Sequence, residues 1–270
     1  MSLDWVTYGG GLGVVMVMAV ATWLISIPKR DVSIVDSIWS LMFLAAGWWY
    51  WSAAPVHTTR AGIVLVLLSL WALRLSVYIT WRNRGEGEDR RYQEIRRNNE
   101  PHFALKSLYV VFALQAVLAW IVSLPLAAAI GGAAPLGALD LAGVGLWLCG
   151  MVFEVGGDWQ LARFKSRAEN RGRVLDRGLW RYTRHPNYFG EFCVWWGFFL
   201  MAASAGAWWA VIAPLLMSFL LLRVSGVVLL EKDIAERRPA YRDYIKHTNA
   251  FFPGPRRGGA ATGLREESTP

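Results

Sequence analysis

The sequence predicts an all-α membrane protein, a polytopic helical bundle with seven transmembrane helices. Of its 270 residues 55% are hydrophobic and 16 are Trp, which is more apolar and richer in Trp than ordinary soluble domains. Apolar runs of about 20 residues, the length that crosses a bilayer, recur along the chain. Loops rich in Lys and Arg alternate with loops that hold almost none. The positive-inside rule therefore places the N-terminus outside and the C-terminus in the cytoplasm.

The first three predicted spans cover residues 8–28, 34–53 and 61–81. The first span lacks the basic start and the small-residue cleavage site of a signal peptide, so we expect it to be retained. Lys29 and Arg30 follow it directly, whereas Arg60 is the one Lys or Arg between the second span and the third. This asymmetry orients the first two connections on opposite sides of the membrane.

The remaining four predicted spans cover residues 107–130, 137–156, 188–204 and 207–228. The stretch from Arg82 to Lys106 carries seven Lys or Arg, and the stretch from Arg163 to Arg184 carries eight. The loops after the fourth and sixth spans carry none. The alternation predicts seven spans, since six or eight would break it.

One domain is expected over residues 1–255, because no polar segment is long enough to bury a core alone. Residues 256–270 are polar and rich in Gly, which predicts a disordered tail. The four His and two Cys show no close spacing of the kind that metal sites use, so no metal site is expected. The basic residues are explained by topology, and no nucleic-acid-binding motif is present.

The basic loops contain acids, amides and aromatic rings as well as cations. Topology and attraction to anionic lipid head groups account for some of the Lys and Arg. They do not account for Asp158, Asn187 or Glu191 among them. Arginines bind phosphates, carboxylates accept hydrogen bonds from ribose hydroxyls, and aromatic faces stack on a base. The loops therefore predict a site for an anionic ligand that also carries sugars and a planar ring.

Five ionisable residues lie inside predicted spans, where a charge is costly and usually functional. They are Asp36, Arg74, Glu154, Glu191 and Arg223. In the predicted topology each lies toward the cytoplasmic end of its helix. Any one of them could extend to the interface, but all five together predict a polar cavity that opens to the cytoplasm.

The segment "GLWRYTRHPNYFGE" (178–191) resembles the signature of bacterial proteins in the steroid 5-alpha-reductase-like superfamily. It is also similar to the C14 sterol reductase and lamin B receptor family. Further resemblance extends over "SIVDSIWS" (33–40), "LRLSVYITWRNRGEGEDRRY" (73–92) and "LLEKDIAERRPAYRDYIKHTNAFFP" (229–253). The resemblance implies a helical membrane protein that binds NADPH on its cytoplasmic side. Hydride would pass to an activated C=C bond of a lipid-like substrate, such as a 3-oxo-4-ene steroid.

The resemblance also implies roles for individual residues. Those implied to bind the cofactor are Arg74, Tyr78, Asp158, Lys165, Arg173, Trp180, Asn187, Tyr188 and Glu231. Where the steroid 5-alpha-reductases have a Tyr on the third helix, this sequence has Trp71. Their Gln-Glu pair on the second helix is missing, so Asp36, or Ser37, would take its place. Asp36 and Trp71 are thus the expected catalytic residues.

The stretch "RHPNYFGE" (184–191) is expected to form a wall of the cofactor site. Pro186 suits the first turn of a helix, whose free N–H groups favour an anion. Arg184 and His185, just before the turn, are expected to face phosphate. Asn187 and Tyr188, just after it, are expected to reach ribose or the carboxamide, and Glu191 to hold an arginine such as Arg74 or Arg223. The alternative is an interfacial anchor, because a membrane boundary also favours Arg, His, Tyr and Trp.

NADPH should bind better than NADH, because its additional phosphate should find a cation in the loop after the fifth span. The candidates are Arg163, Lys165, Arg167, Arg171 and Arg173.

Two other functional classes stay open. The "RHP-x-Y-x-G" pattern and the C-terminal "Y-x2-Y" pattern are shared with membrane methyltransferases of the isoprenylcysteine carboxyl methyltransferase type. Their cofactor, S-adenosylmethionine, has no phosphate, so the density of Arg favours NADPH. A non-enzymatic lipid-binding protein would keep the amphipathic loops but would not need charges inside its spans.

The expected partners are a lipid-like small molecule and membrane lipids, and the expected location is the bacterial inner membrane, with the active site open to the cytoplasm. The sequence predicts neither the exact substrate nor the oligomeric state.

Overall fold

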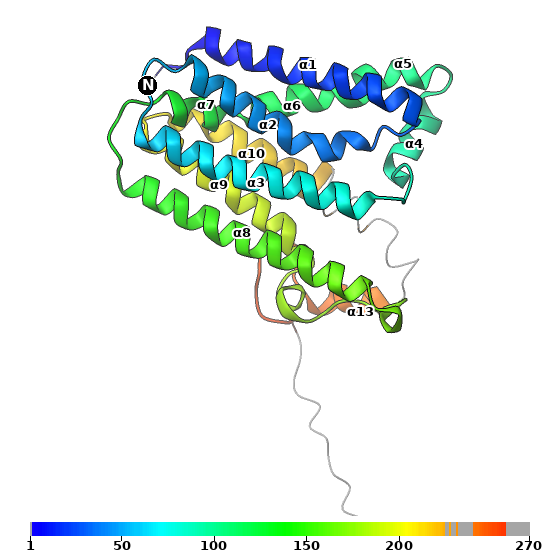
Figure 1. Cartoon of the computed structure of the whole chain (residues 1–270). Helices are drawn as coiled ribbons and strands as arrows, with labels where there is room; N and C mark the ends of the chain where they lie inside the picture. Colours follow the sequence, from blue (N-terminus) through cyan, green and yellow to red (C-terminus); the bar gives the residue numbers. More distant parts are fainter. Residues whose placement is uncertain (1, 225–226, 228–230, 232–239, 258–270) are drawn as a thin grey trace, which may run out of the picture. The chain divides into compact units, whose positions relative to one another are not determined.

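The structure is a computed structural model that describes residues 2–224, 227, 231 and 240–257. This part of the chain is helical, with turns between the helices and no β-strand (Figure 1). The chain divides into two compact units, which are described separately. Unit 1 comprises Met1–Gly145 and Trp195–Leu216, and unit 2 comprises Leu146–Val194 and Met217–Pro270. That residues 1–255 form a single domain stays a prediction.

Unit 1 begins with three long helices, α1 (Trp5–Lys29), α2 (Ile34–Ala53) and α3 (Thr59–Asn83). Asp4 caps α1 by accepting from the backbone N–H groups of Val6 and Thr7, and Thr58 caps α3. α2 contacts both α1 and α3 (Figure 1).

A second group of helices follows in unit 1, namely α4 (Arg90–Asn99), α5 (Phe103–Ser107), the π-helix η1 (Leu108–Ala113), α6 (Leu114–Val122) and α7 (Leu124–Gly131). α6 packs on α1, where the rings of Tyr8 and Trp120 stack with centroids 4.5 Å apart. The Tyr50 hydroxyl of α2 hydrogen-bonds to Ser123 at 2.8 Å. These contacts join the two groups of helices into one core.

A buried ion pair lies within unit 1. Arg60, in the first turn of α3, is 1% exposed, and its Nε and Nη2 donate to the two carboxylate oxygens of Asp140 at 2.7 and 2.9 Å. Ser204 donates to the same carboxylate at 2.5 Å. Arg60 also donates to the carbonyls of Ala134 and Pro135. The sequence places Arg60 alone in the loop between the second and third predicted spans. In the structure its charge is compensated by the buried carboxylate of Asp140.

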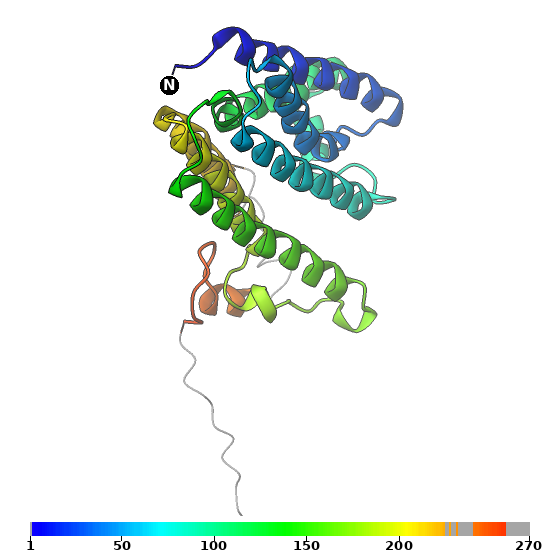
Figure 2. The same ribbon diagram turned by 60° about the vertical axis from the view of Figure 1, so that its left-hand side comes forward.

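The helices α8 (Ala138–Lys165) and α9 (Pro186–Ser204) lie side by side (Figures 1 and 2). In unit 2 they meet at glycines. A Cβ at Gly190 would lie 2.5 Å from the carbonyl oxygen of Gly150, and one at Gly150 would lie 2.6 Å from that of Gly190. The two backbones touch here because neither residue has a side chain, as is common between membrane helices.

The other elements are short. Two 3₁₀ turns, η2 (Ala168–Asn170) and η3 (Gly178–Arg181), lie between α8 and α9. After α9 come η4 (Trp208–Val211), α10 (Ile212–Phe219), the π-helix η5 (Leu220–Val224) and α13 (Ala240–His247). Arg256, the first residue of the predicted disordered tail, donates to Asp176 at 2.8 Å, and the tail from 258 onward lies outside the described residues.

Four helical segments are long and apolar enough to cross a membrane: Trp5–Lys29, Thr59–Asn83, Phe103–Gly131 and Ala138–Lys165. They correspond to the predicted first, third, fourth and fifth spans. The second and sixth predicted spans are the helices α2 and α9, of 20 and 19 residues. Trp208–Val224 is a shorter apolar helix where the seventh was expected, and part of that prediction lies outside the described residues. Seven spans and their orientation stay predictions.

Candidate functional site

The stretch "RHPNYFGE" joins a loop to the start of α9 in unit 2. Pro186 is the first residue of that helix, so the predicted helix start is confirmed. Proline suits this position because it has no N–H to leave unpaired and its φ angle is already helical. Thr183, before the turn, is fully buried and donates to the carbonyl of Phe251 at 2.7 Å. The turn is thereby attached to the C-terminal part of unit 2.

Arg184 and His185 both bind Glu231. Arg184 donates from Nε and Nη2 to the two carboxylate oxygens at 2.7 and 2.8 Å, a bidentate pair. Nε2 of His185 lies 2.9 Å from the same carboxylate. Arg184 also donates from Nη1 to the carbonyls of Thr248 and Ile245, at 2.5 and 3.1 Å. The structure therefore places Arg184 and His185, 7% and 5% exposed, against protein acceptors.

The carboxyl group of Glu231 is held in its charged form. Burial alone would raise its pKa, but the hydrogen bonds from His185 and Arg184 and the guanidinium charge outweigh burial and lower the pKa to about 2. Glu231 is thus a carboxylate at neutral pH and links the motif to the segment that follows α10.

Asp158 and Asn187 meet where α8 passes the start of α9. The amide of Asn187 donates to the carboxylate of Asp158 at 3.2 Å. The backbones of α8 and α9 approach closely here, since a Cβ at Gly157 would lie 3.1 Å from the backbone nitrogen of Asn187. Trp180 donates its indole N–H to the carbonyl of Gly157 at 3.0 Å, and the Tyr244 hydroxyl donates to the carbonyl of Trp180. Asp158 and Asn187 thus form a hydrogen-bonded pair, and Trp180 binds the backbone of Gly157, the residue before Asp158; these three residues are called the polar cluster of unit 2.

Two cavities lie beside the C-terminal end of α8, and arginines line both. The first has a volume of about 370 Å³, and its lining includes Trp159, Arg163, Arg167 and Arg177. The second, of about 290 Å³, shares Arg167 and Arg177 and adds Arg173. The guanidinium of Arg163 lies 5.3 Å from the centre of the Trp159 ring. Cations beside an exposed indole can bind a phosphorylated molecule that also has a planar ring.

The structure places the other predicted residues of unit 2 as follows. Lys165 is the last residue of α8, and Tyr188 stacks on His185 with centroids 5.6 Å apart. Glu191 lies on α9, one turn after Asn187. Arg177 was missed as a candidate, although it belongs to the basic stretch that was noted.

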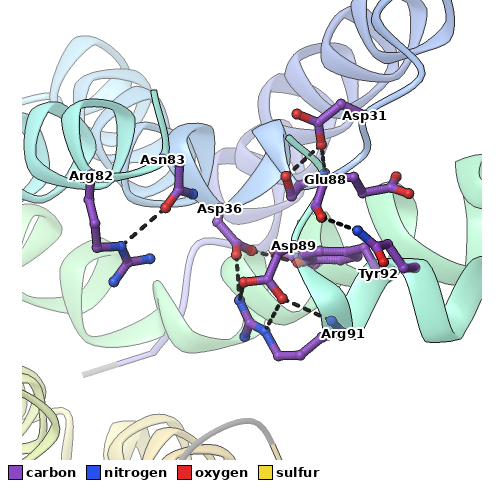
Figure 3. A network of polar contacts seen from close by, with 11 residues as sticks. Asp31, Asp36, Arg82, Asn83, Glu88, Asp89, Arg91 and Tyr92 are labelled. Carbon is purple, nitrogen blue, oxygen red and sulfur yellow. Dashed lines mark hydrogen bonds and ion pairs between the residues drawn. The ribbon is translucent and has the colours of Figure 1, made fainter. Parts of the chain in front are cut away.

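Asp36, an expected catalytic residue, lies in unit 1 and accepts hydrogen bonds from α4 (Figure 3). The Tyr92 hydroxyl donates to it at 2.5 Å and Nη2 of Arg91 at 2.9 Å. Tyr92 accepts in turn from the side-chain amide of Gln115 on α6, at 2.9 Å. The sequence alone does not point to Tyr92 and Gln115, because the contacts join residues 56 and 23 positions apart.

Acidic residues fasten the loop before α4. Glu88 accepts from the guanidinium of Arg96 and from the backbone N–H of Val32. Asp89 accepts from Arg91 (Figure 3). Burial opposes ionisation of Asp89, but the hydrogen bonds and charge of Arg91 keep its pKa below its usual value. The phenol of Tyr92 has a raised pKa, because it is buried and lies beside the Asp36 carboxylate. The cluster therefore keeps Tyr92 as a neutral hydroxyl.

Trp71, Arg74 and Tyr78 follow one another along α3, also in unit 1. Trp71 is fully buried and lies against Phe43 and Trp195, with ring centroids 5.8 and 5.5 Å away. The guanidinium of Arg74 lies over the ring of Tyr78 at 5.3 Å, so the predicted pair is in contact.

The five intramembrane charges are divided between the units. Asp36 and Arg74 belong to unit 1, while Glu154, Glu191 and Arg223 belong to unit 2. A single cavity shared by all five stays a prediction.

Comparison with known proteins identifies the family. The family described as "Protein of unknown function (DUF1295)" matches residues 22–248. The chain belongs to this family. An uncharacterized protein of Schizosaccharomyces pombe is 27% identical over 283 residues, which cover 90% of this chain and 78% of that protein.

The chain is also similar to steroid dehydrogenases. Mouse 3-oxo-5-alpha-steroid 4-dehydrogenase 1 is 38% identical over 64 residues, and the bovine protein of the same name is 34% identical over 68 residues. These matches cover 24% and 25% of this chain, and only 25% and 26% of the two dehydrogenases. No solved structure matches the chain.

These findings place the DUF1295 chain in the steroid 5-alpha-reductase-like superfamily. Its four apolar helices and its family indicate an integral membrane protein. The superfamily points to a membrane reductase.

Proposed function

We propose that this protein is a membrane-embedded reductase that uses NADPH to reduce an activated C=C bond of a steroid-like or other lipid-like enone. The proposal rests above all on one feature of unit 2. Around the end of α8, a polar cluster of Asp158, Trp180 and Asn187 lies near two cavities lined by arginines. The similarity to 3-oxo-5-alpha-steroid 4-dehydrogenases supports the reaction class.

The residues present fit the chemistry of this cofactor. Arg163, Arg167 and Arg177 would bind its phosphates, and the exposed ring of Trp159 offers a face for the adenine. The carboxylate of Asp158 can accept from a hydroxyl group, and the amide of Asn187 can both donate and accept. NADPH would supply the hydride, and a proton from water would complete the saturated ketone.

Arg184, His185 and Glu231 are better suited to position the site than to touch the cofactor. Arg184 uses four of its five N–H groups on Glu231 and on backbone carbonyls. The network fixes the turn that presents Asn187 and Tyr188. Asp36 and Trp71 remain the proposed residues at the substrate, where Asp36, which accepts hydrogen bonds, would act by orienting the Tyr92 hydroxyl.

NADPH is preferred to S-adenosylmethionine because of the arginines. The second cavity brings Arg167, Arg173 and Arg177 to one place. S-adenosylmethionine is a cation at sulfur and has no phosphate, so this concentration of positive charge would repel it.

Replacing Asn187 by Leu tests the proposal. We expect Asn187→Leu to weaken NADPH binding about 5- to 150-fold, because a cofactor polar group would lose its partner at a cost of about 1–3 kcal/mol. The measurement is NADPH-dependent thermal stabilisation of the purified protein in detergent.

Asn98→Leu is the matched control, since Asn98 is exposed on α4 in unit 1. It should bind NADPH as the parent does. If Asn187→Leu folds and binds NADPH like the parent, the motif is an interfacial anchor and the reductase proposal loses its main support.

A further inference from the structure

Gln115 is a polar residue in an unusual place. It lies near the middle of the apolar segment Phe103–Gly131, one of the four long enough to cross a membrane. Its side-chain amide donates one N–H to Tyr92 at 2.9 Å. Within the part of the chain that the structure describes, its second N–H and its carbonyl oxygen make no hydrogen bond. A carboxamide inside the bilayer is costly and usually marks a functional site.

The backbone before Gln115 is also unusual. The six residues Leu108–Ala113 form a π-helix, and α6 resumes at Leu114. A π-helical turn inserts an extra residue and re-aims the side chains that follow, and such turns are frequent at functional sites. Leu114 and Val117, on either side of Gln115, are 51% and 37% exposed. Gln115 itself is half-buried, and Ala119, one turn further along the same face, is fully buried. The side chain of Gln115 therefore lies between the packed face of the helix and the exposed flank that carries Leu114 and Val117.

A second unused donor belongs to unit 1. Among the described residues, the buried indole N–H groups without a hydrogen-bond acceptor belong to Trp39, Trp147 and Trp195. Trp39 follows Asp36 by three residues on α2, so both project from the same face of the helix. A buried donor without an acceptor costs about 1–3 kcal/mol, and such a group in a native protein calls for an explanation.

Polar and apolar groups follow one another along this face of α2. At its start, the Asp36 carboxylate, the Tyr92 hydroxyl and the Gln115 amide form a hydrogen-bonded chain. One turn further on is Trp39, whose ring meets Phe43 with centroids 4.9 Å apart. Phe43 in turn meets Trp195 at 4.6 Å. The face thus passes from hydrogen-bonding groups to aromatic rings.

We infer that this face of unit 1 binds the carbonyl end of a neutral, lipid-like molecule, with the N–H groups of Gln115 and Trp39 as donors to its oxygen. The inference rests on the proposed function and names the part of the chain that takes the substrate. A neutral ligand is required because the Asp36 charge is already compensated by Arg91, at 2.9 Å. An acceptor oxygen is required because an indole can only donate. The aromatic rings take the apolar body of the molecule.

The test compares ketones with hydrocarbons of the same shape. The pairs are cholest-4-en-3-one with cholest-4-ene, and nonadecan-2-one with nonadecane. Binding of each tritiated ketone to the full-length protein in lipid nanodiscs, without nucleotide, is competed with its unlabelled ketone and with its hydrocarbon. In the parent protein, one ketone or both should compete more strongly than the matched hydrocarbon.

Gln115→Leu and Trp39→Phe each remove one donor and keep an apolar side chain. Each should weaken ketone binding about 2- to 10-fold, since a neutral hydrogen bond contributes about 0.5–1.5 kcal/mol, and should leave hydrocarbon binding unchanged. Gln93→Leu, exposed on α4, and Trp147→Phe, a buried indole of unit 2, are the matched controls. Both should bind ketone as the parent does.

The inference is overturned if neither ketone binds more tightly than its hydrocarbon. It is also overturned if Trp39→Phe and Gln115→Leu both keep the full preference for ketone over hydrocarbon. For Gln115→Leu only the protein that elutes as a folded species in size-exclusion chromatography is measured. That outcome would mean that the Trp39 N–H points at the face of an aromatic ring and does not bind the ligand. NADPH-dependent stabilisation of the same variants separates the two proposals. Loss of ketone preference with NADPH binding intact supports this site, whereas a parent protein that binds ketone but not NADPH contradicts only the reductase proposal.

Discussion

At the scale of single residues, Glu231 is the residue on which the "RHPNYFGE" turn depends. Its carboxylate accepts from Arg184 and His185, and its pKa is lowered to about 2 from an ordinary value of 4.5. A group with a lowered pKa stabilises the folded protein above its unfolded pKa, and the stabilisation is lost as the pH falls toward the folded pKa.

We therefore expect Glu231→Gln to destabilise the protein at pH 7 by about 1–3 kcal/mol, because Arg184 loses a charged partner. The difference in melting temperature between the variant and the parent should shrink as the pH falls below about 4.5, since the unfolded parent then binds a proton at Glu231 that the folded parent does not bind. Thermal unfolding in detergent at several pH values measures this.

Asp243→Asn is the control for Glu231→Gln. Asp243 pairs with Lys246 on the surface, where both side chains are more than two-thirds exposed, so its loss should have little effect. A difference for Glu231→Gln that stays constant from pH 7 to pH 3 would mean that the charge is not what stabilises the turn.

At the scale of helices, the contact between α8 and α9 in unit 2 depends on glycine. We expect Gly190→Ala to destabilise the protein by about 1–3 kcal/mol, because its Cβ would lie 2.5 Å from the backbone of α8 and would force the helices apart. A lower melting temperature is the measurement. Since Asn187 lies on the same turn of α9, NADPH binding should weaken too.

Gly145→Ala is the matched control on α8, because a Cβ there meets nothing within 4 Å. Alanine should be neutral or slightly stabilising at this position, since it favours the helix. Equal melting temperatures for Gly190→Ala and the parent would contradict the close contact.

The helices show which parts of the fold can be predicted from the sequence. Apolar runs predict helices well, because about 20 consecutive residues that are mostly apolar are long enough to cross a bilayer as a helix. The start of α9 followed from the local chemistry of Pro186. The partner of Asp36 could not be predicted, because Tyr92 lies 56 positions away and reaches it only through the turn after α3. Glu231 was a candidate by resemblance, but its contact with Arg184 across 47 positions appears only in the structure.

At the scale of the whole molecule, the distribution of charge predicts how the protein lies in the membrane. The stretches 82–106 and 163–184 carry 15 Lys or Arg in total, seven and eight, and should both lie in the cytoplasm. A fluorescent protein fused after Pro270 should therefore be bright when the fusion is expressed in bacteria. An alkaline phosphatase fused at the same place should be inactive. A dark fluorescent fusion with an active phosphatase would contradict this orientation.

The central claim is that the arginine-lined end of unit 2 binds NADPH, and nucleotide binding to the purified protein tests it most directly. The protein is purified in detergent without added nucleotide, and its melting temperature is measured with NADPH, NADH and S-adenosylmethionine over a range of concentrations. NADPH should stabilise at lower concentration than NADH, by about 10- to 150-fold, which corresponds to one charge-assisted contact of about 1.5–3 kcal/mol. S-adenosylmethionine should not stabilise. Equal stabilisation by NADH and NADPH, or stabilisation by S-adenosylmethionine alone, would contradict the claim.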